Sequence, residues 1–153
     1  MSPNLKKSGL LPAGVHLATW DELVERFGFN EHRLKLLEGL KKGLKALHKH
    51  NCYDIYIGGS FVTDKPEPGD VDVCFDNSFM KWKAFQNNYP EFSLNEKGFY
   101  NQFKKYKSNF YPYNSYDDYF FLFFQYSRNG EPKGLVKLSL KEVFNNDTKR
   151  KTI

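Results

Sequence analysis

The chain has 153 residues, a formal net charge of +5 and a sequence pI near 9.1. Its length allows one folded domain rather than two, and its apolar content of 40% excludes a chain that is disordered over most of its length. The two cysteines exclude a disulfide framework, and the lack of a long apolar segment excludes a membrane helix and a secretory signal, so we expect a cytoplasmic protein without a membrane partner.

The first third of the chain predicts an arm followed by two helices. Residues 1–14 contain prolines and glycines, and we expect a flexible arm there. Thr19 and Glu22 have the spacing of a capping box, which predicts a short helix that ends at Gly28. Asn30 is expected to cap a second helix, whose apolar face carries leucines at three- and four-residue steps: Leu34, Leu37, Leu40, Leu44 and Leu47.

The middle of the chain predicts two paired strands. The run Tyr53–Ile57 alternates polar and apolar residues, and Val71–Phe75 is apolar around a single acid and includes Cys74, which we expect in the core. Prolines in the loop over residues 64–69 bar both helix and strand, so the two runs are expected to form a hairpin around a stiff loop. Aromatic residues at helical spacing then predict a helix over residues 78–88.

The second half of the chain has a less regular pattern. We expect a helix over residues 96–106 and an irregular loop through residues 111–113. The aromatic run Tyr119–Tyr126 is typical of a strand buried on both faces. A turn at residues 128–130 and an alternating run at Leu135–Leu140 would complete a terminal hairpin.

Helices and strands therefore interleave around a mixed sheet, and the predicted class is α/β (α+β). We expect a single domain over residues 15–145, between the arm and a basic tail at residues 146–153.

Two acids on the second predicted strand point to a metal. Asp70 and Asp72 are two residues apart, so in a strand their side chains share one face. Adjacent carboxylates repel each other unless a cation lies between them. Oxygen ligands suit Mg²⁺ or Mn²⁺, which take their remaining ligands from water and substrate phosphates.

The glycine corner before these acids supplies the complementary chemistry. Gly58 and Gly59 let the backbone approach a ligand closely, and Ser60 can offer its hydroxyl and amide hydrogen to phosphate oxygens. Acids for a metal and donors for phosphate together predict a site for a metal-bound nucleoside triphosphate.

Gly59-Ser60 followed by Asp70-Val71-Asp72 resembles the hG[G/S]…Dh[D/E]h signature of the nucleotidyltransferase fold. From about Leu11 onward the chain is similar to a family of small bacterial and mobile-element nucleotidyltransferase-like proteins of unknown function. The resemblance implies a mixed sheet flanked by helices, with Asp70 and Asp72 as catalytic metal ligands. It also implies phosphate binding by Gly59 and Ser60, and transfer of a nucleotide to a hydroxyl of RNA, protein or a small molecule.

The chain departs from that pattern in two places. Active members of the fold present a third carboxylate on a neighbouring strand, and the nearest acids here are Asp117 and Asp118, whose alternative role is a solvated cap. The arginine that often follows the glycine corner is missing, which leaves Thr63 and Lys65 as phosphate contacts, although Lys65 is also explained as a surface lysine.

Two other functions stay open. The missing third acid favours a non-catalytic module that binds a partner protein, and the resemblance suggests a toxin–antitoxin or phage-defence setting for it. Alternatively, lysines and aromatic rings between Phe99 and Tyr116 could bind RNA, but the rings equally suit a small aromatic core and the lysines a solvated surface.

Overall fold

The computed structural model describes the backbone of residues 4–151 and the side chains of residues 4–145. Its strands form one five-stranded mixed sheet in the order β1-β5-β2-β3-β4. The strands are β1 (Val15–Leu17), β2 (Asp54–Gly58), β3 (Val71–Asp76), β4 (Ser108–Tyr113) and β5 (Leu135–Ser139). The pairs β1/β5 and β3/β4 are parallel, while β2 is antiparallel to both β5 and β3. The predicted mixed α/β class is confirmed.

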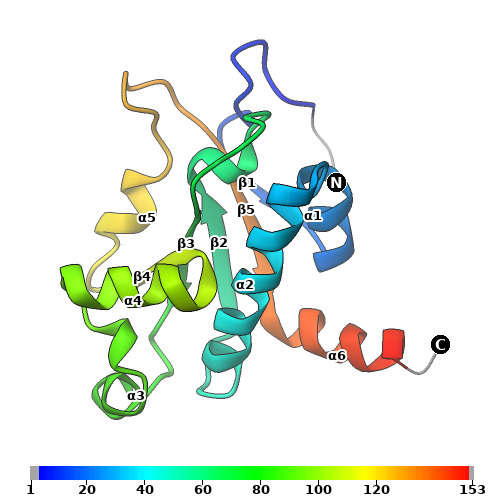
Figure 1. Cartoon of the computed structure of the whole chain (residues 1–153). Helices are drawn as coiled ribbons and strands as arrows, with labels where there is room; N and C mark the ends of the chain where they lie inside the picture. The colour runs from blue at the N-terminus through cyan, green and yellow to red at the C-terminus, as the bar shows by residue number, and fades with distance from the viewer. Residues whose placement is uncertain (1–3, 152–153) are drawn as a thin grey trace.

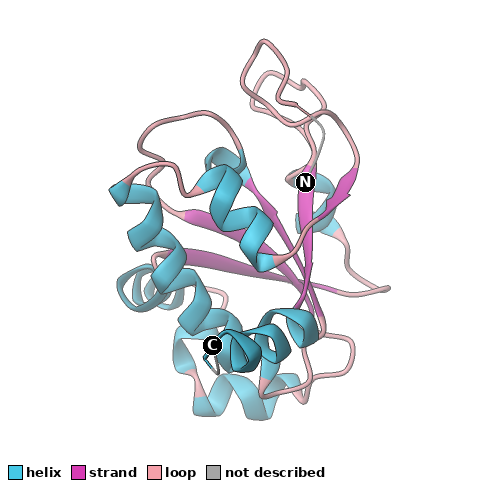
Figure 2. Cartoon of the chain, turned by 90° about the vertical axis from the view of Figure 1, so that its right-hand side faces the viewer, coloured by secondary structure: helices cyan, strands magenta, loops and turns pink. Residues whose placement is uncertain are grey.

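The helices cover this sheet unequally (Figures 1 and 2). They are α1 (Trp20–Phe27), α2 (Glu31–His48), α3 (Trp82–Asn88), α4 (Glu96–Tyr106), α5 (Tyr119–Phe123) and α6 (Leu140–Lys151), with 3-10 turns η1 (Gly59–Val62) and η2 (Pro90–Phe92). Helices α2 and α4 lie in front of the strands in Figure 1, and most helices lie on one side of the sheet in Figure 2. The main apolar core fills the space between them and the sheet.

The predicted helix starts are confirmed. Thr19 and Glu22 form both bonds of a capping box, at 3.1 and 2.9 Å, and Asn30 caps α2 by accepting a hydrogen bond from the backbone N–H of Arg33. Helix α4 has the predicted bounds, whereas α3 begins only at Trp82. The predicted face of α2 is buried except at Leu34, which is 44% exposed.

The predicted hairpin is also confirmed, and its register matters for the site. Strands β2 and β3 pair antiparallel, with Gly58 opposite Asp72 and Ile57 opposite Val73. Alternation along β3 places Val71, Val73 and Phe75 in the main core. Cys74 is buried on the other side of the sheet, as the sequence predicted for a core cysteine.

The predicted strand over residues 119–126 is wrong. Tyr119–Phe123 is the short helix α5, and Tyr119 and Phe123 are largely exposed. The terminal hairpin is wrong for the same reason, because β5 pairs with β1 and β2 instead. The sheet is formed by five other strands, and the aromatic run covers one of its faces and buries only part of its rings.

The predicted loop at residues 111–113 is wrong as well. These residues belong to β4, which runs parallel to β3 and forms the edge of the sheet. Pro112 lacks a backbone N–H, and an edge strand tolerates this because one side of it has no partner strand.

The structure describes the two ends of the chain to different extents. Residues 4–14 contain no regular element, yet Leu11 is buried and Leu10 forms an isolated bridge with Thr63. The predicted basic tail at residues 146–153 lies outside the described side chains, and the backbone of α6 continues to Lys151.

A buried arginine ties α2 to the loop after the glycine corner. The Arg33 guanidinium has no exposed surface and donates five hydrogen bonds of 2.7–3.1 Å to backbone carbonyls. The acceptors belong to Phe27, Phe61, Thr63 and Lys65. Burial lowers the pKa of Arg33 to about 10, so the side chain remains charged at neutral pH.

We predict that Arg33→Met lowers the free energy of unfolding by at least about 3 kcal/mol, since each buried carbonyl left without a donor costs about 1–3 kcal/mol. Urea denaturation measures this change. Lys35→Met, which alters an exposed lysine on the same helix, is the control and should change stability by less than about 0.5 kcal/mol. Equal midpoints for the two variants would show that Arg33 does not hold the loop.

Candidate functional site

The two acids of the predicted metal site lie on the side of the sheet away from α2 and α4. Asp72 alternates along β3 with Val71 and Val73, which face the main core. Asp70 directly precedes this strand, and it contacts the same side chain as Asp72, that of Asn109. The structure therefore brings the two carboxylates together, as the sequence predicted.

The glycine corner and the acids fit each other at one contact. Gly59 has a φ of +69°, a left-handed backbone conformation that strains any residue with a Cβ. A Cβ on Gly59 would clash with Oδ2 of Asp72 and would lie 3.2 Å from its Cβ. Glycine is therefore required here twice, by the turn and by the carboxylate that lies against it.

Asn109 occupies the strand next to the acids and was missed in the sequence. On β4 it lies opposite Asp72 in the parallel register, and its Nδ2 donates to Oδ2 of Asp70 at 2.7 Å. Its side chain also lowers the pKa of Asp72. Finding it required the β3/β4 pairing, because the sequence around residue 109 contains no acid motif.

The environment destabilises the charged form of both carboxyl groups. Burial raises the pKa of Asp70, against the opposing effect of Asn109. Burial and the charge of Asp70 together raise the pKa of Asp72 to about 7. Burial is the main cause of both raised pKa values, and the Asn109 amide and the nearby lysines offset it only in part.

A cavity of about 910 Å³ opens beside Asp72. Gly59 and Ser60 line it, and Ser60 belongs to the turn η1, where the sequence placed a turn or helix start. Arg128 and Lys133 line it too, and they were not predicted because they lie far from the motif in the chain. Burial lowers the pKa of Lys133, and the charge of Asp72 opposes that effect.

The other predicted contacts lie elsewhere. The Thr63 hydroxyl donates to the carbonyl of Ser60 at 2.6 Å, which stabilises the turn, and Lys65 is exposed but close enough to Asp70 to lower its pKa. Neither side chain lines the cavity. Asp117 and Asp118 do not line it either; Asp117 accepts a hydrogen bond from the backbone N–H of Tyr119.

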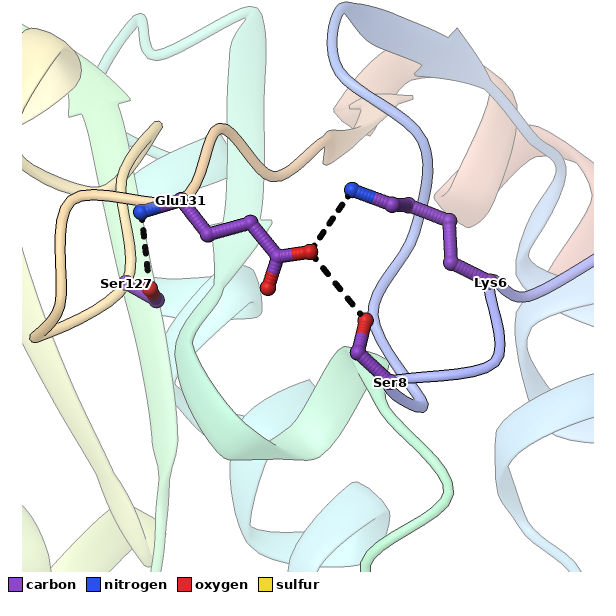
Figure 3. A network of polar contacts seen from close by, with 4 residues as sticks. All are labelled: Lys6, Ser8, Ser127 and Glu131. Atoms are coloured by element: carbon purple, nitrogen blue, oxygen red, sulfur yellow. Dashed lines mark hydrogen bonds and ion pairs between the residues drawn. The ribbon is translucent and has the colours of Figure 1, made fainter.

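The N-terminal arm joins the two sides of the cavity. Lys6 forms an ion pair of 2.8 Å with Glu131, whose backbone N–H donates to the Ser127 hydroxyl (Figure 3). Ser8 makes a longer hydrogen bond, 3.4 Å, to the same carboxylate (Figure 3). The backbone N–H of Asp64 donates to the carbonyl of Gly9 on the other side. The arm thus contacts both the loop after Ser60 and the segment that carries Arg128 and Lys133.

The residues suit a divalent cation only in part. Among the described residues no group of three or more His, Cys, Asp and Glu side chains could hold a metal. Two close carboxylates and an amide are nonetheless oxygen ligands of the kind that Mg²⁺ uses when substrate phosphates complete its coordination. Asp70 and Asp72 would hold such an ion.

A family model matches residues 3–139, which include the arm, the glycine corner, both acids and Lys133. The chain belongs to DUF6932, a family of unknown function. The comparison with curated proteins finds no match, and neither does the comparison with solved structures. Every residue of the candidate site therefore lies within the DUF6932 match. Over the part of the chain that the structure describes, no helix has both the length and the apolarity to cross a membrane.

We predict that Gly59→Ala lowers the free energy of unfolding by about 2 kcal/mol or more, because it adds backbone strain and pushes against Asp72. Thermal and urea denaturation measure the loss. Gly69→Ala is the matched control, since a Cβ there meets nothing within 4 Å, and it should leave stability unchanged or raise it by up to about 1 kcal/mol. Equal stability of the two variants would contradict the contact between Gly59 and Asp72.

We also predict that the metal-free protein loses stability as pH rises from about 4 to 7. The pKa of Asp72 is about 7 in the folded protein and near 3.9 in an unfolded chain, so across this window the folded form holds the extra proton. The free energy of unfolding then falls with rising pH, on the order of 4 kcal/mol in total. Asp70, Asn109 and Lys133 are the groups that act on this carboxyl.

Urea denaturation in a chelator at several pH values measures this dependence. Asp72→Asn should flatten the curve, because the amide does not titrate. A slope that is the same in the variant would show that Asp72 is not the titrating group.

Proposed function

We propose that the protein binds a nucleoside triphosphate together with Mg²⁺ or Mn²⁺ and transfers a nucleotide to an acceptor hydroxyl. The observation that carries this proposal is the contact between the glycine corner and Asp72 at the mouth of a cavity that also contains Lys133. Asp72, the glycine turn and two cations line this cavity, and Asp70 lies next to Asp72 outside the lining. These are the groups needed to bind a metal and a triphosphate together. The same features support a nucleotidyltransferase-like form of the mixed sheet.

The chain's own residues would orient the reactants. Gly59 and Ser60 bind phosphate oxygens, and Lys133 and Arg128 balance their charge. Asp70 and Asp72 would hold the metal ion, which would stabilise negative charge on the phosphates. The acceptor oxygen bonds to the α-phosphorus, the bond to the oxygen that bridges to the β-phosphorus breaks, pyrophosphate leaves, and the hydroxyl proton passes to solvent. RNA, protein and small molecules all offer such a hydroxyl.

We predict that Asp70→Asn combined with Asp72→Asn abolishes Mg²⁺-dependent binding of nucleoside triphosphate, at least 100-fold in affinity, because both anionic ligands are lost. Titration calorimetry measures binding. Asp76→Asn is the control: it lies on the same strand, and an amide oxygen can still accept the hydrogen bond from the Ser78 backbone N–H. Unchanged affinity in the double variant would refute the site.

Asn109 favours a second function, that of a non-catalytic binding module. It occupies the neighbouring strand directly opposite Asp72, where its amide cannot serve as a third anionic ligand or accept the acceptor's proton as a carboxylate does. In this case the bound nucleotide would control contact with a partner protein, as in the toxin–antitoxin or phage-defence setting that the family resemblance suggested.

A labelling experiment separates the two functions. The protein is incubated with each α-³²P nucleoside triphosphate, Mg²⁺ or Mn²⁺, and total RNA or cell protein. Transfer by the unmodified chain, absent in the double Asn variant, establishes the enzyme. If the unmodified chain binds nucleotide without transfer, we predict that Asn109→Asp gains transfer, because it supplies the third carboxylate; an inactive but folded Asn109→Asp would show that Asn109 is not what prevents catalysis.

A further inference from the structure

The cavity beside Asp72 has a second, aromatic wall. Beyond the polar end formed by Gly59, Ser60 and Asp72, it is lined by rings from β4, from α5 and from the segment that follows α5. These rings belong to Tyr111, Tyr119, Phe120, Phe123, Phe124 and Tyr126. Six aromatic residues along one cavity form a surface that suits a flat, apolar part of a ligand.

The inner part of the wall is fixed on the sheet. Tyr111 of β4 packs against Phe120 and Phe124, with ring centroids 4.8 and 5.0 Å apart. Phe124 is buried and also lies against Gly58, since a Cβ on this glycine would be 3.2 Å from Cβ of Phe124. Helix α5 is thus held directly beside the glycine corner.

The outer part of the wall consists of exposed rings that face the cavity. Tyr119 and Phe123 are one helical turn apart, their rings lie within 24° of parallel, and their centroids are 6.1 Å apart. They are 62% and 58% exposed, respectively. Large rings that stay exposed beside a cavity mark a binding surface.

We propose that this aromatic wall binds the base of the nucleotide whose phosphates lie at the Gly59 and Ser60 end, an assignment that rests on the proposed function. The cavity joins a π surface to Arg128 and Lys133, and a nucleotide is the ligand class that matches both, with a flat base and an anionic tail. Stacking on an aromatic side chain tolerates every base, and the larger ring system of a purine covers more of the wall. The preferred substrates are therefore purine nucleoside triphosphates.

The test compares ATP with inorganic tripolyphosphate, which has the anionic tail but no base, in Mg²⁺ with the full chain. Titration calorimetry should show ATP binding about 5- to 150-fold more tightly, the range that corresponds to stacking of one base. Phe123→Ala and Tyr119→Ala should weaken ATP binding by such a factor and leave tripolyphosphate binding unchanged. CTP should bind more weakly than ATP.

Leu122→Ala is the matched control. Leu122 lies on the same helix and is 51% exposed, but it does not line the cavity, so its truncation should change neither affinity. The truncated rings are mostly exposed, so the variants should keep the thermal stability of the unmodified chain. Phe123→Trp should restore ATP binding, and ATP but not tripolyphosphate should quench its fluorescence; the chain's other tryptophans, Trp20 and Trp82, pack away from this cavity.

The outcomes separate this inference from the proposed function. Equal affinities for ATP and tripolyphosphate would overturn the aromatic wall as a base site while leaving the metal and phosphate site intact. Binding of neither probe would overturn both. An ATP affinity that falls as much in Leu122→Ala as in Phe123→Ala would overturn the assignment of the rings.

Discussion

The geometry of the site depends on Arg33, a buried cation that lies outside the site. Arg33 fixes the loop from Phe61 to Lys65 through carbonyl hydrogen bonds, and its guanidinium lies between the rings of Phe29 and Phe61. Backbone dipoles, rather than a carboxylate in direct contact, balance the charge, and Asp64 adds attraction from nearby. These hydrogen bonds restrict the loop to positions that keep its carbonyls on the guanidinium, and the loop continues directly from the turn that begins at Gly59.

A rigid turn matters because the site is assembled from segments that are distant in the sequence. The register that sets Gly58 opposite Asp72 brings the turn to the acids, the pairing of β3 with β4 adds Asn109, and the arm connects the turn to the segment with Lys133. The exposed ion pair of Lys6 contributes little stability by itself. The ion pair instead restricts the position of the segment that carries Lys133. The buried Leu11 anchors the arm in the core.

Local patterns predicted what depends on local physics. The caps at Thr19 and Asn30, the hairpin and the shared face of the two acids follow from side-chain spacing alone. The aromatic run at Tyr119 gave a wrong prediction because continuous apolar residues fit a buried strand and a sheet-covering helix equally well, and the pattern alone does not decide between them. Pro112 suggested a loop, although an edge strand accepts it. The roles of Arg33 and of the site residues beyond the motif could not be predicted from the sequence, because the tertiary fold brings their contact partners to them.

The charges at the site also relate the two binding events of the proposed function, that of the metal and that of the nucleotide. At the polar end of the site, Asp72 lies near Lys133, and Asp70 lies near Lys65, which is exposed to solvent. Asn109 adds only a neutral amide, so two ionised carboxylates would exceed the one partly buried cation. A triphosphate arriving alone would add negative charge beside this excess, and Arg128 is exposed and screened by solvent. A divalent ion between the acids and the phosphates changes the sign of the interaction. In the proposed function, the balance of charge would make metal and nucleotide binding mutually dependent, and the aromatic wall would act on the uncharged base alone.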